Sequence, residues 1–201
     1  MRGRDRLDLY YAHIDDRDTP QEETVDALAE LAESGAVGLL GCSNTALWRI
    51  ERARGIARAA GRPAYSCIQQ RHSYLLPLPR LRQTNLITEE LIDYAEADNL
   101  TLLAYSPLLG GLYPRDERPS GEYAHAANDE RLAVLGAVAK ELNATPSQVV
   151  LAWLLASRPS IIPIIGASSV AQLDELLGAL NVTLDEETMA RLDAAGRTDG
   201  G

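Results

Sequence analysis

The sequence predicts an α/β fold in which five parallel strands alternate with amphipathic helices. Five short, continuously apolar runs begin at residues 7, 36, 64, 101 and 161, and such runs are typical of strands buried on both faces of a parallel sheet. Amphipathic stretches with helix-start signals separate them. Polar residues follow each run at its carboxyl end. The uneven spacing of the runs argues against a solenoid of repeats.

The composition is that of an ordinary globular protein. The chain has 201 residues, of which 46% are hydrophobic and 24% charged, and this length fits one domain with a sizeable core. A net charge of −10 argues against nucleic acid or an anionic membrane as a partner. No run approaches the roughly 20 apolar residues of a membrane span, and the first residues lack the apolar part of a secretory leader. We therefore expect a cytoplasmic protein in which Cys42 and Cys67 are reduced core residues.

The first strand-helix unit begins with the apolar run 7–13. Thr19 is the expected N-cap of the helix that follows. Pro20 stands at the first helical position, and Glu22 comes three residues after the cap. Gly35 then ends the helix, as a glycine just past the last turn commonly does.

The second and third units repeat this order. The run 36–42 is a strand, and Ser43 and Asn44 lead into a helix that Gly61 ends. The third strand covers 64–69, and the third helix covers 88–98.

The fourth strand, 101–105, is followed by a long Gly/Pro-rich loop over about 108–128. A helix over 128–142 comes next. The helix after it begins with a capping box, in which Thr145 is the N-cap and Gln148 stands three residues later.

The fifth strand covers 161–166, with Ser168 or Ser169 capping the next helix and a last helix starting near Asp185. Two architectures fit this order: an open doubly wound sheet, or part of a (β/α)₈ barrel. The Gly-x-Gly-x-x-Gly phosphate loop of a dinucleotide-binding open sheet is absent from the sequence. Its absence favours the barrel.

Polar clusters mark the carboxyl end of every predicted strand. Ligands of parallel α/β folds bind at that edge, and in a barrel all these ends face one mouth. The asymmetry between the two edges indicates an active or binding site. The clusters, in strand order, are His13 with Asp15 and Asp16; Ser43 and Asn44; Gln69, Gln70 and His72; Tyr105 and Ser106; and Gly166 with Ala167, Ser168 and Ser169.

Each cluster also has a purely structural interpretation. His13 fits either a catalytic group or a hydrogen-bonded residue at a strand end. Ser43 and Asn44 are also ordinary helix-capping residues, and Tyr105 fits a core position with its hydroxyl paired. An amide in a doubly buried strand, such as Gln69 or Gln70, needs a partner. The stretch 166–172 joins a glycine to a helix start, and it suits either a phosphate site or a simple serine cap.

A metal-dependent hydrolase is a weaker alternative. It would use His13, Asp15 and His72 as ligands. One histidine beside two adjacent aspartates lacks good ligand spacing, so we expect no bound metal.

The sequence resembles the aldo-keto reductase family from about Leu7 to Ala195. Five motifs in the family's order carry this resemblance: Leu7-Asp8-Leu9-Tyr10-Tyr11-Ala12-His13, Gly41-Cys42-Ser43-Asn44, Ile68-Gln69, Ala104-Tyr105-Ser106-Pro107-Leu108, and Pro163-Ile164-Ile165-Gly166-Ala167-Ser168-Ser169 with Gln172-Leu173. The resemblance implies a partial (β/α)₈ TIM barrel that reduces small aldehydes and ketones with NADP(H), with NAD(H) as the alternative cofactor.

Roles carry over position by position. By resemblance, His13 is the active-site histidine that orients the substrate carbonyl. The cofactor-binding residues fall into three groups: Ser43, Asn44 and Gln69 for the nicotinamide carboxamide; Tyr105, Ser106 and Leu108 for the nicotinamide ring and the pyrophosphate; and Gly166, Ser168, Gln172 and Glu175 for the adenosine phosphate.

The sequence departs from the family in two respects. The family's proton donor is a tyrosine tuned by a lysine and an aspartate on its first three strand-helix units, and the resemblance here begins at the fourth. Lys140, the only lysine, lies mid-helix and does not match by position. No Lys or Arg lies between Arg158 and Arg191, where a 2′-phosphate partner is usual, which leaves Arg115 or Arg118 as alternatives.

These departures set three expectations. We expect residues 1–201 to form a single truncated reductase barrel domain with little or no activity as an isolated chain. A regulatory or pseudoenzyme module that binds the nicotinamide cofactor without turnover is the alternative function. We also expect homo-oligomers, because a five-strand remnant of a barrel leaves open sheet edges.

Overall fold

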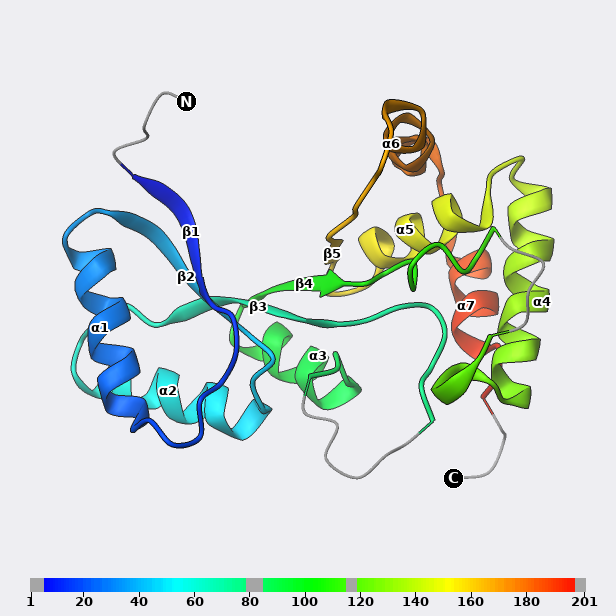
Figure 1. Ribbon diagram of the computed structural model, residues 1–201. Helices are drawn as coiled ribbons and strands as arrows, with labels where there is room; N and C mark the ends of the chain where they lie inside the picture. The colour runs from blue at the N-terminus through cyan, green and yellow to red at the C-terminus, as the bar shows by residue number, and fades with distance from the viewer. Residues whose placement is uncertain (1–5, 79–84, 115–118, 198–201) are drawn as a thin grey trace. The chain divides into compact units, whose positions relative to one another are not determined.

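The computed structural model describes residues 6–78, 85–114 and 119–197 (Figure 1). Within these residues the strands follow one another in the order β1-β2-β3-β4-β5. The chain divides into two compact units: the first holds the described residues of Met1–Gln70 and Arg82–Leu103, and the second those of Arg71–Leu81 and Ala104–Gly201. The predicted single domain over residues 1–201 stays a prediction.

Four of the predicted strands form where the sequence places them. They are β1 (Leu7–Ala12), β2 (Val37–Ser43), β3 (Tyr65–Arg71) and β4 (Thr101–Tyr105). β1 and β2 run parallel, with Leu9 opposite Leu39 and Tyr11 opposite Gly41. The Tyr11 ring lies over Gly41 so closely that a Cβ there would overlap it. This close approach explains a glycine inside an otherwise apolar strand.

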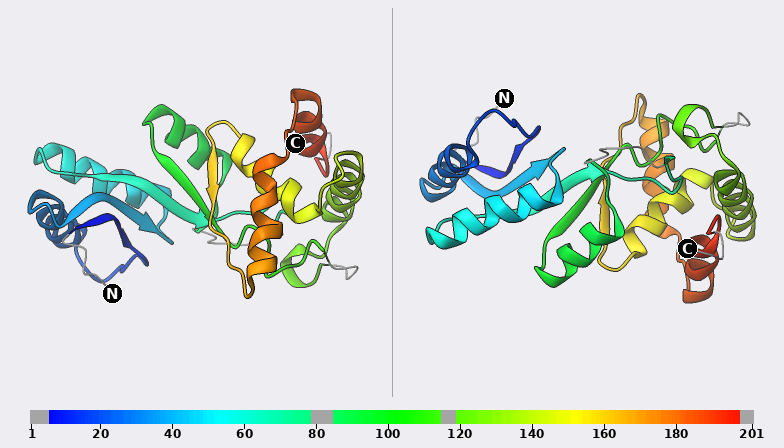
Figure 2. Two further views of the ribbon diagram at one scale, coloured as in Figure 1. Left: turned by 90° about the horizontal axis from the view of Figure 1, so that it is seen from above. Right: turned by 90° about the horizontal axis from the view of Figure 1, so that it is seen from below.

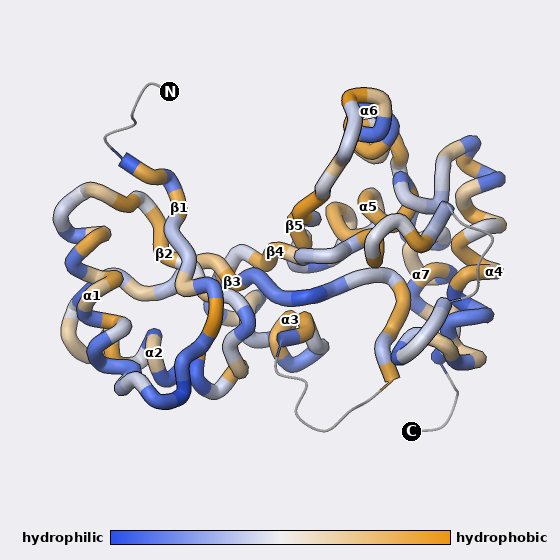
Figure 3. The backbone as a smooth tube through the Cα atoms, viewed as in Figure 1, coloured by the Kyte–Doolittle hydropathy of each residue, from blue (hydrophilic) through white to orange (hydrophobic). Residues whose placement is uncertain are grey.

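Three helices belong to the first unit: α1 (Gln21–Glu33), α2 (Leu47–Ala59) and α3 (Glu89–Ala97). α1 packs against α2 and β2, and Figure 3 shows apolar and polar residues alternating along both helices. Their apolar faces bury Val25, Leu28 and Ile50. Arg54 joins α2 to α3 through hydrogen bonds to Asp98 (2.6 Å) and to the Tyr94 hydroxyl (3.0 Å).

The predicted cap of α1 is wrong. Pro20 occupies the N-cap position, and no side chain caps the helix. The Thr19 hydroxyl instead donates to the Asp16 carboxylate at 2.7 Å. The helix begins at Gln21, one residue later than expected, so Thr19 lies before the N-cap position.

The second unit surrounds helix α5. α5 packs against α4, β5 and α6 (Figure 2), and most of its residues are buried. The elements of this unit are β5 (Ile161–Pro163), α4 (Ala126–Glu141), α5 (Pro146–Ala156), α6 (Val170–Leu177), α7 (Glu186–Ala194) and the 3₁₀ segments η1 (Gly121–Tyr123) and η2 (Gly178–Asn181).

The helix caps predicted here are confirmed. Thr145 and Gln148 form the capping box of α5. Of the two serines offered for α6, Ser169 is the cap. The last helix starts at Glu186, next to Asp185 as predicted, and the Asp185 side chain caps it.

Two predicted boundaries in this unit are wrong. β5 ends at Pro163 rather than at residue 166, although the Ile164 N–H still donates to the Ala104 carbonyl. α4 begins two residues earlier than predicted. Asn128 lies inside it, and its side chain bonds the backbone of Leu76.

Cys42 and Cys67 are free and buried, as expected. Burial raises the pKa of the Cys42 thiol to about 12, which leaves it protonated at neutral pH. Among residues 6–78, 85–114 and 119–197, no helix combines the length and apolar character that a membrane crossing needs.

Candidate functional site

His13 stands exposed just after β1. Its main-chain carbonyl accepts a hydrogen bond of 3.1 Å from the Asn44 side chain, which joins the ends of β1 and β2. Asn44 has a left-handed backbone (φ 50°), a conformation that asparagine tolerates better than most residues. The local geometry therefore fixes the main chain at His13 and leaves its imidazole open to solvent.

Ser43 and Gln69 lie at the same strand ends. Ser43 is fully buried, and its hydroxyl oxygen accepts from the Asn44 amide at 3.2 Å. Gln69 is half-buried, next to the Tyr11 hydroxyl. Burial raises the pKa of Tyr11 to about 12.

Gln70, and not Gln69, is the amide that is fully buried and hydrogen-bonded to neighbouring backbone. It is 1% exposed. Its side chain accepts from the Asn44 N–H at 3.0 Å and donates to the Thr45 carbonyl at 2.6 Å. A buried amide with both ends paired in this way holds the turn after β2 against the end of β3.

Arg49 is a residue that the sequence reasoning missed. It is 7% exposed, and its Nε lies 2.8 Å from each oxygen of the Asp15 carboxylate. A second bond of 3.2 Å runs to the Asp16 carbonyl. Arg49 therefore holds the loop that follows His13. The only signal for this in the sequence is an arginine on the buried side of α2.

The second group of predicted residues begins at the end of β4. Tyr105 is half-buried, and Ser106 is exposed with a left-handed backbone (φ 53°). Leu108 is half-buried and packs with Ile165 against the apolar cluster of Leu151, Leu176 and Ala179. The predicted pyrophosphate residues therefore sit on a turn that is fixed at Leu108.

The turn between β5 and α6 is more open. Gly166 and Ser168 are exposed, and a Cβ on Gly166 would meet nothing within 4 Å. The Gln172 side chain accepts from the Ser168 N–H at 2.7 Å and from its hydroxyl at 3.1 Å. The Ser168 N–H and hydroxyl at the start of α6 are thus both paired with the Gln172 side chain.

Glu175 has a different local role. Its carboxylate accepts from the Thr145 hydroxyl at 2.5 Å, and its carbonyl accepts from the Gln148 amide at 2.7 Å. It therefore binds α6 to the capping box of α5, and its predicted contact with the cofactor stays a prediction.

The predicted residues gather in two places, each inside one unit. His13, Ser43, Asn44 and Gln69 share the carboxyl ends of β1–β3, and the other seven lie at the end of β4, in the turn after it, and from the turn after β5 into α6. Arg115 and Arg118, the alternative partners for a 2′-phosphate, lie outside the described residues.

A metal site finds no support in the described part of the chain, where no group of three or more His, Cys, Asp and Glu could hold an ion. Two of the residues in that interpretation have other partners. Arg49 and Arg17 pair with Asp15, and the His72 ring stacks on Trp153 at 5.7 Å between centroids.

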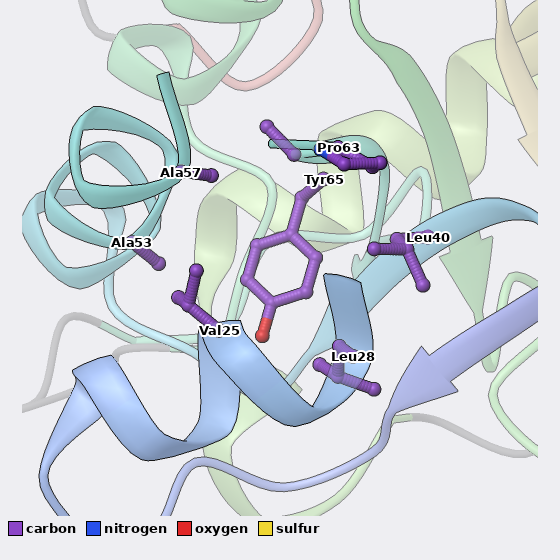
Figure 4. Close-up of a pocket in the computed structure, with 8 residues that line it drawn as sticks. Val25, Leu28, Leu40, Ala53, Ala57, Pro63 and Tyr65 are labelled. Carbon is purple, nitrogen blue, oxygen red and sulfur yellow. The ribbon is translucent and has the colours of Figure 1, made fainter. Parts of the chain in front are cut away.

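A small cavity in the first unit lies between helices α1 and α2 and the sheet (Figure 4). Its volume of about 10 Å³ would hold about one water molecule. The lining side chains are apolar apart from the Tyr65 hydroxyl, and a buried water needs two to four polar partners, so the cavity is a packing gap and not a ligand site. The lining residues are Val25, Leu28, Leu40, Ala53, Ala57, Pro63, Ala64 and Tyr65.

Comparison with known proteins identifies the family. The profile of the Aldo/keto reductase family matches residues 2–197. This chain belongs to the aldo/keto reductase family. The crystal structure of the thermostable aldo-keto reductase Tm1743 in complex with the inhibitor epalrestat is similar, with a TM-score of 0.74 and 30% identity over 94% of this chain and 60% of that one. The five parallel strands thus match part of the family's TIM barrel, as the sequence predicts.

Curated relatives agree. An uncharacterized oxidoreductase of Mycobacterium tuberculosis is 35% identical over 96% of this chain and 59% of its own length. The NADP(+) aldo-keto reductase yakc of Schizosaccharomyces pombe is 31% identical over 96% and 58%, and pyridoxine 4-dehydrogenase of Escherichia coli is 30% identical over 97% and 59%. The chain spans slightly less than three fifths of these relatives.

Proposed function

We propose that this chain is the cofactor-binding part of an NADP(H)-dependent reductase of small aldehydes and ketones, with His13 as the catalytic residue that orients the substrate carbonyl. The observation that carries the proposal is the exposed imidazole of His13 on a main chain that Asn44 holds at 3.1 Å. A side chain that is free to meet a ligand on a fixed backbone is the arrangement that a catalytic group needs.

The side chains at the strand ends fit a nicotinamide dinucleotide in kind. The amides of Asn44 and Gln69 match a carboxamide, which both donates and accepts hydrogen bonds. Tyr105 offers an aromatic face, and the exposed start of α6 offers N–H groups and the positive end of a helix dipole. When bound, the cofactor would supply the hydride for carbonyl reduction.

The preference for NADP over NAD has weaker support. The relative yakc is named for NADP(+). No Lys or Arg lies between Arg158 and Arg191 in this sequence, so no cation from that stretch meets a 2′-phosphate. We expect NADPH to bind more tightly than NADH by a small factor only.

A cofactor-binding module without turnover is the second candidate. Lys140, the only lysine of the sequence, is exposed in α4. By its position in the middle of α4 it does not match the lysine that tunes the proton-donating tyrosine in the family. Binding without reduction is the behaviour that this candidate predicts.

Titration of NADPH fluorescence with the 201-residue chain tests both candidates. We expect saturable binding that Gln69→Ala and Tyr105→Ala weaken, and negligible oxidation of NADPH by a simple aldehyde. Robust turnover that His13→Ala abolishes would refute the module and support a complete active site. Failure to bind NADPH or NADH, in a chain with a cooperative unfolding transition, would overturn both candidates.

A further inference from the structure

Two buried hydroxyls meet beneath the loop that follows β4. Ser73 is 4% exposed and Tyr113 is 5% exposed. Their oxygens lie 2.6 Å apart. The Ser73 hydroxyl also donates to the Pro107 carbonyl at 2.5 Å, and the Leu75 N–H donates to the Tyr113 oxygen at 3.0 Å.

Counting protons fixes the direction of these bonds. A carbonyl oxygen only accepts, so the single proton of Ser73 goes to Pro107. Ser73 must then accept from Tyr113, whose own oxygen accepts from Leu75. Burial raises the pKa of Tyr113 above its usual value, which keeps its proton in place. The bonds form one chain with one polarity, from the Leu75 N–H to the Pro107 carbonyl.

The loop at the Pro107 end of these hydrogen bonds contains backbone conformations that its residues do not favour by themselves. Ser106 and Leu109 have left-handed backbones, with φ of 53° and 48°. Side chains other than glycine pay strain in that region, and such positions persist only where the surroundings fix them. Within the loop itself, short turns run from Leu109 to Ser106 and from Gly111 and Leu112 to Leu108.

We propose that Ser73 and Tyr113 are positioning residues that hold the 106–112 loop in the shape that receives the cofactor's pyrophosphate. Pro107, whose carbonyl accepts the Ser73 hydrogen bond, lies between Ser106 and Leu108, the two predicted pyrophosphate contacts. The inference rests on the proposed function for its ligand. Its structural part, a loop held through the Pro107 carbonyl, is measurable without any ligand.

The experiment compares Tyr113→Phe and Ser73→Ala with Tyr74→Phe in the full chain. Tyr74 is a matched control because it is a buried tyrosine of the same unit whose hydroxyl donates to another carbonyl, that of Leu192, at 3.0 Å. Amide hydrogen exchange rates measure how firmly the loop is held. The dissociation constants of NADPH and of 2′,5′-ADP, which lacks the nicotinamide half, measure binding.

We expect faster exchange at residues 109–112 in Tyr113→Phe and Ser73→Ala, but not in Tyr74→Phe. We expect the dissociation constant for NADPH to rise about fivefold to tenfold in the first two variants, as the loss of a buried hydrogen bond predicts. That for 2′,5′-ADP should stay within about twofold. A purely structural role would weaken both ligands alike. Ser73→Ala keeps the test valid should Tyr113→Phe fail to fold.

Two failures are distinguishable. If the unaltered chain binds NADPH and both variants bind it equally well, the inference is overturned and the proposed function stands. If the unaltered chain binds no NADPH, the proposed function fails and the inference falls with it, whatever the exchange rates show.

Discussion

The ends of β1 and β2 and the turn between β5 and α6 are both predicted to meet the cofactor, yet they are held in opposite ways. At the first place, buried side chains from distant parts of the chain bond the backbone: Gln70 donates to the Thr45 carbonyl, 25 residues away, and Arg49 donates to the Asp16 carbonyl, 33 residues away. At the second, exposed residues bond within four positions of one another.

This difference separates two kinds of binding surface. A strand end fixed by long-range buried bonds presents its ligand groups already in place and loses little entropy on binding. A turn held by local exposed bonds opens at low cost and adapts to its ligand. The histidine end therefore suits a reacting centre, which needs fixed geometry, and the α6 end suits a phosphate, which tolerates several poses.

Removal of the Asp15 carboxylate should have the largest effect. Asp15→Ala leaves the Arg49 guanidinium buried without its anion, because the two side chains are only 10% and 9% exposed. We expect a loss of about 3 kcal/mol in the free energy of unfolding, measured with urea. Arg17→Ala is the control, since Arg17 contacts the same carboxylate but is 51% exposed. Its loss should stay below about 1 kcal/mol, and equal losses in both variants would refute the contrast.

The buried amide of Gln70 comes next. Gln70→Leu keeps the volume but leaves the Asn44 N–H and the Thr45 carbonyl without this partner. We expect a loss of about 2 kcal/mol in urea unfolding. Gln69→Leu, one residue away and half-buried, should lose less than about 1 kcal/mol. A larger effect at Gln69 would reverse the assignment of the two amides.

The cap of α6 should matter less. Ser169→Ala removes the bond from the Gln172 N–H and should cost about 1 kcal/mol. The loss should appear chiefly as faster hydrogen exchange in α6, because the bond is local. Thr145→Ala removes the capping box and the bond to Glu175 at once, and about 2 kcal/mol is expected. If Ser169→Ala lowered global stability as much as Thr145→Ala, the α6 turn would not be the loosely held region.

What the sequence predicts well is what short-range physics decides. The sequence predicts both ends of β4 because its apolar run stops at Ser106. In the structure Asn99 and Ser106, on either side, have left-handed backbones, and polar residues of these types mark such breaks. The Thr145 capping box was found because its members stand three residues apart. The strand-end histidine and amides follow from the fold class alone, since parallel strands end at one edge.

What the sequence does not predict are the partners across long separations. Nothing around Arg49 indicates Asp15, and nothing around Ser73 indicates Tyr113, 40 residues away. Such pairs arise only once the chain has folded. The error at Thr19 is local instead: its pattern fits a helix cap, but the helix begins one residue later than expected and Pro20 takes the N-cap position.

That error leads to the smallest expected effect, a pH dependence confined to one exposed carboxyl. Hydrogen bonds from the Thr19 hydroxyl and the Asp18 N–H lower the pKa of Asp16 below its usual value. A depressed pKa in the folded state adds stability above the unfolded pKa of about 3.9 and loses it as the pH falls through the folded value. Thr19→Val should therefore raise the pKa of Asp16 toward its ordinary value in a ¹³C carboxyl titration.

Asp185 is the internal control for that titration. Its pKa is also lowered, by bonds to Thr188 at the start of α7, and Thr19→Val should leave it unchanged. Because Thr19 does not cap α1, the variant should also leave the exchange rates of the first turn of α1 unchanged. Faster exchange there, with no change at Asp16, would restore Thr19 as the helix cap. The turn at Asp16 would then be held by helix capping, as the turn before α6 is. The contrast between the ends of β1 and β2 and the α6 turn would in that case rest on Arg49 and Gln70.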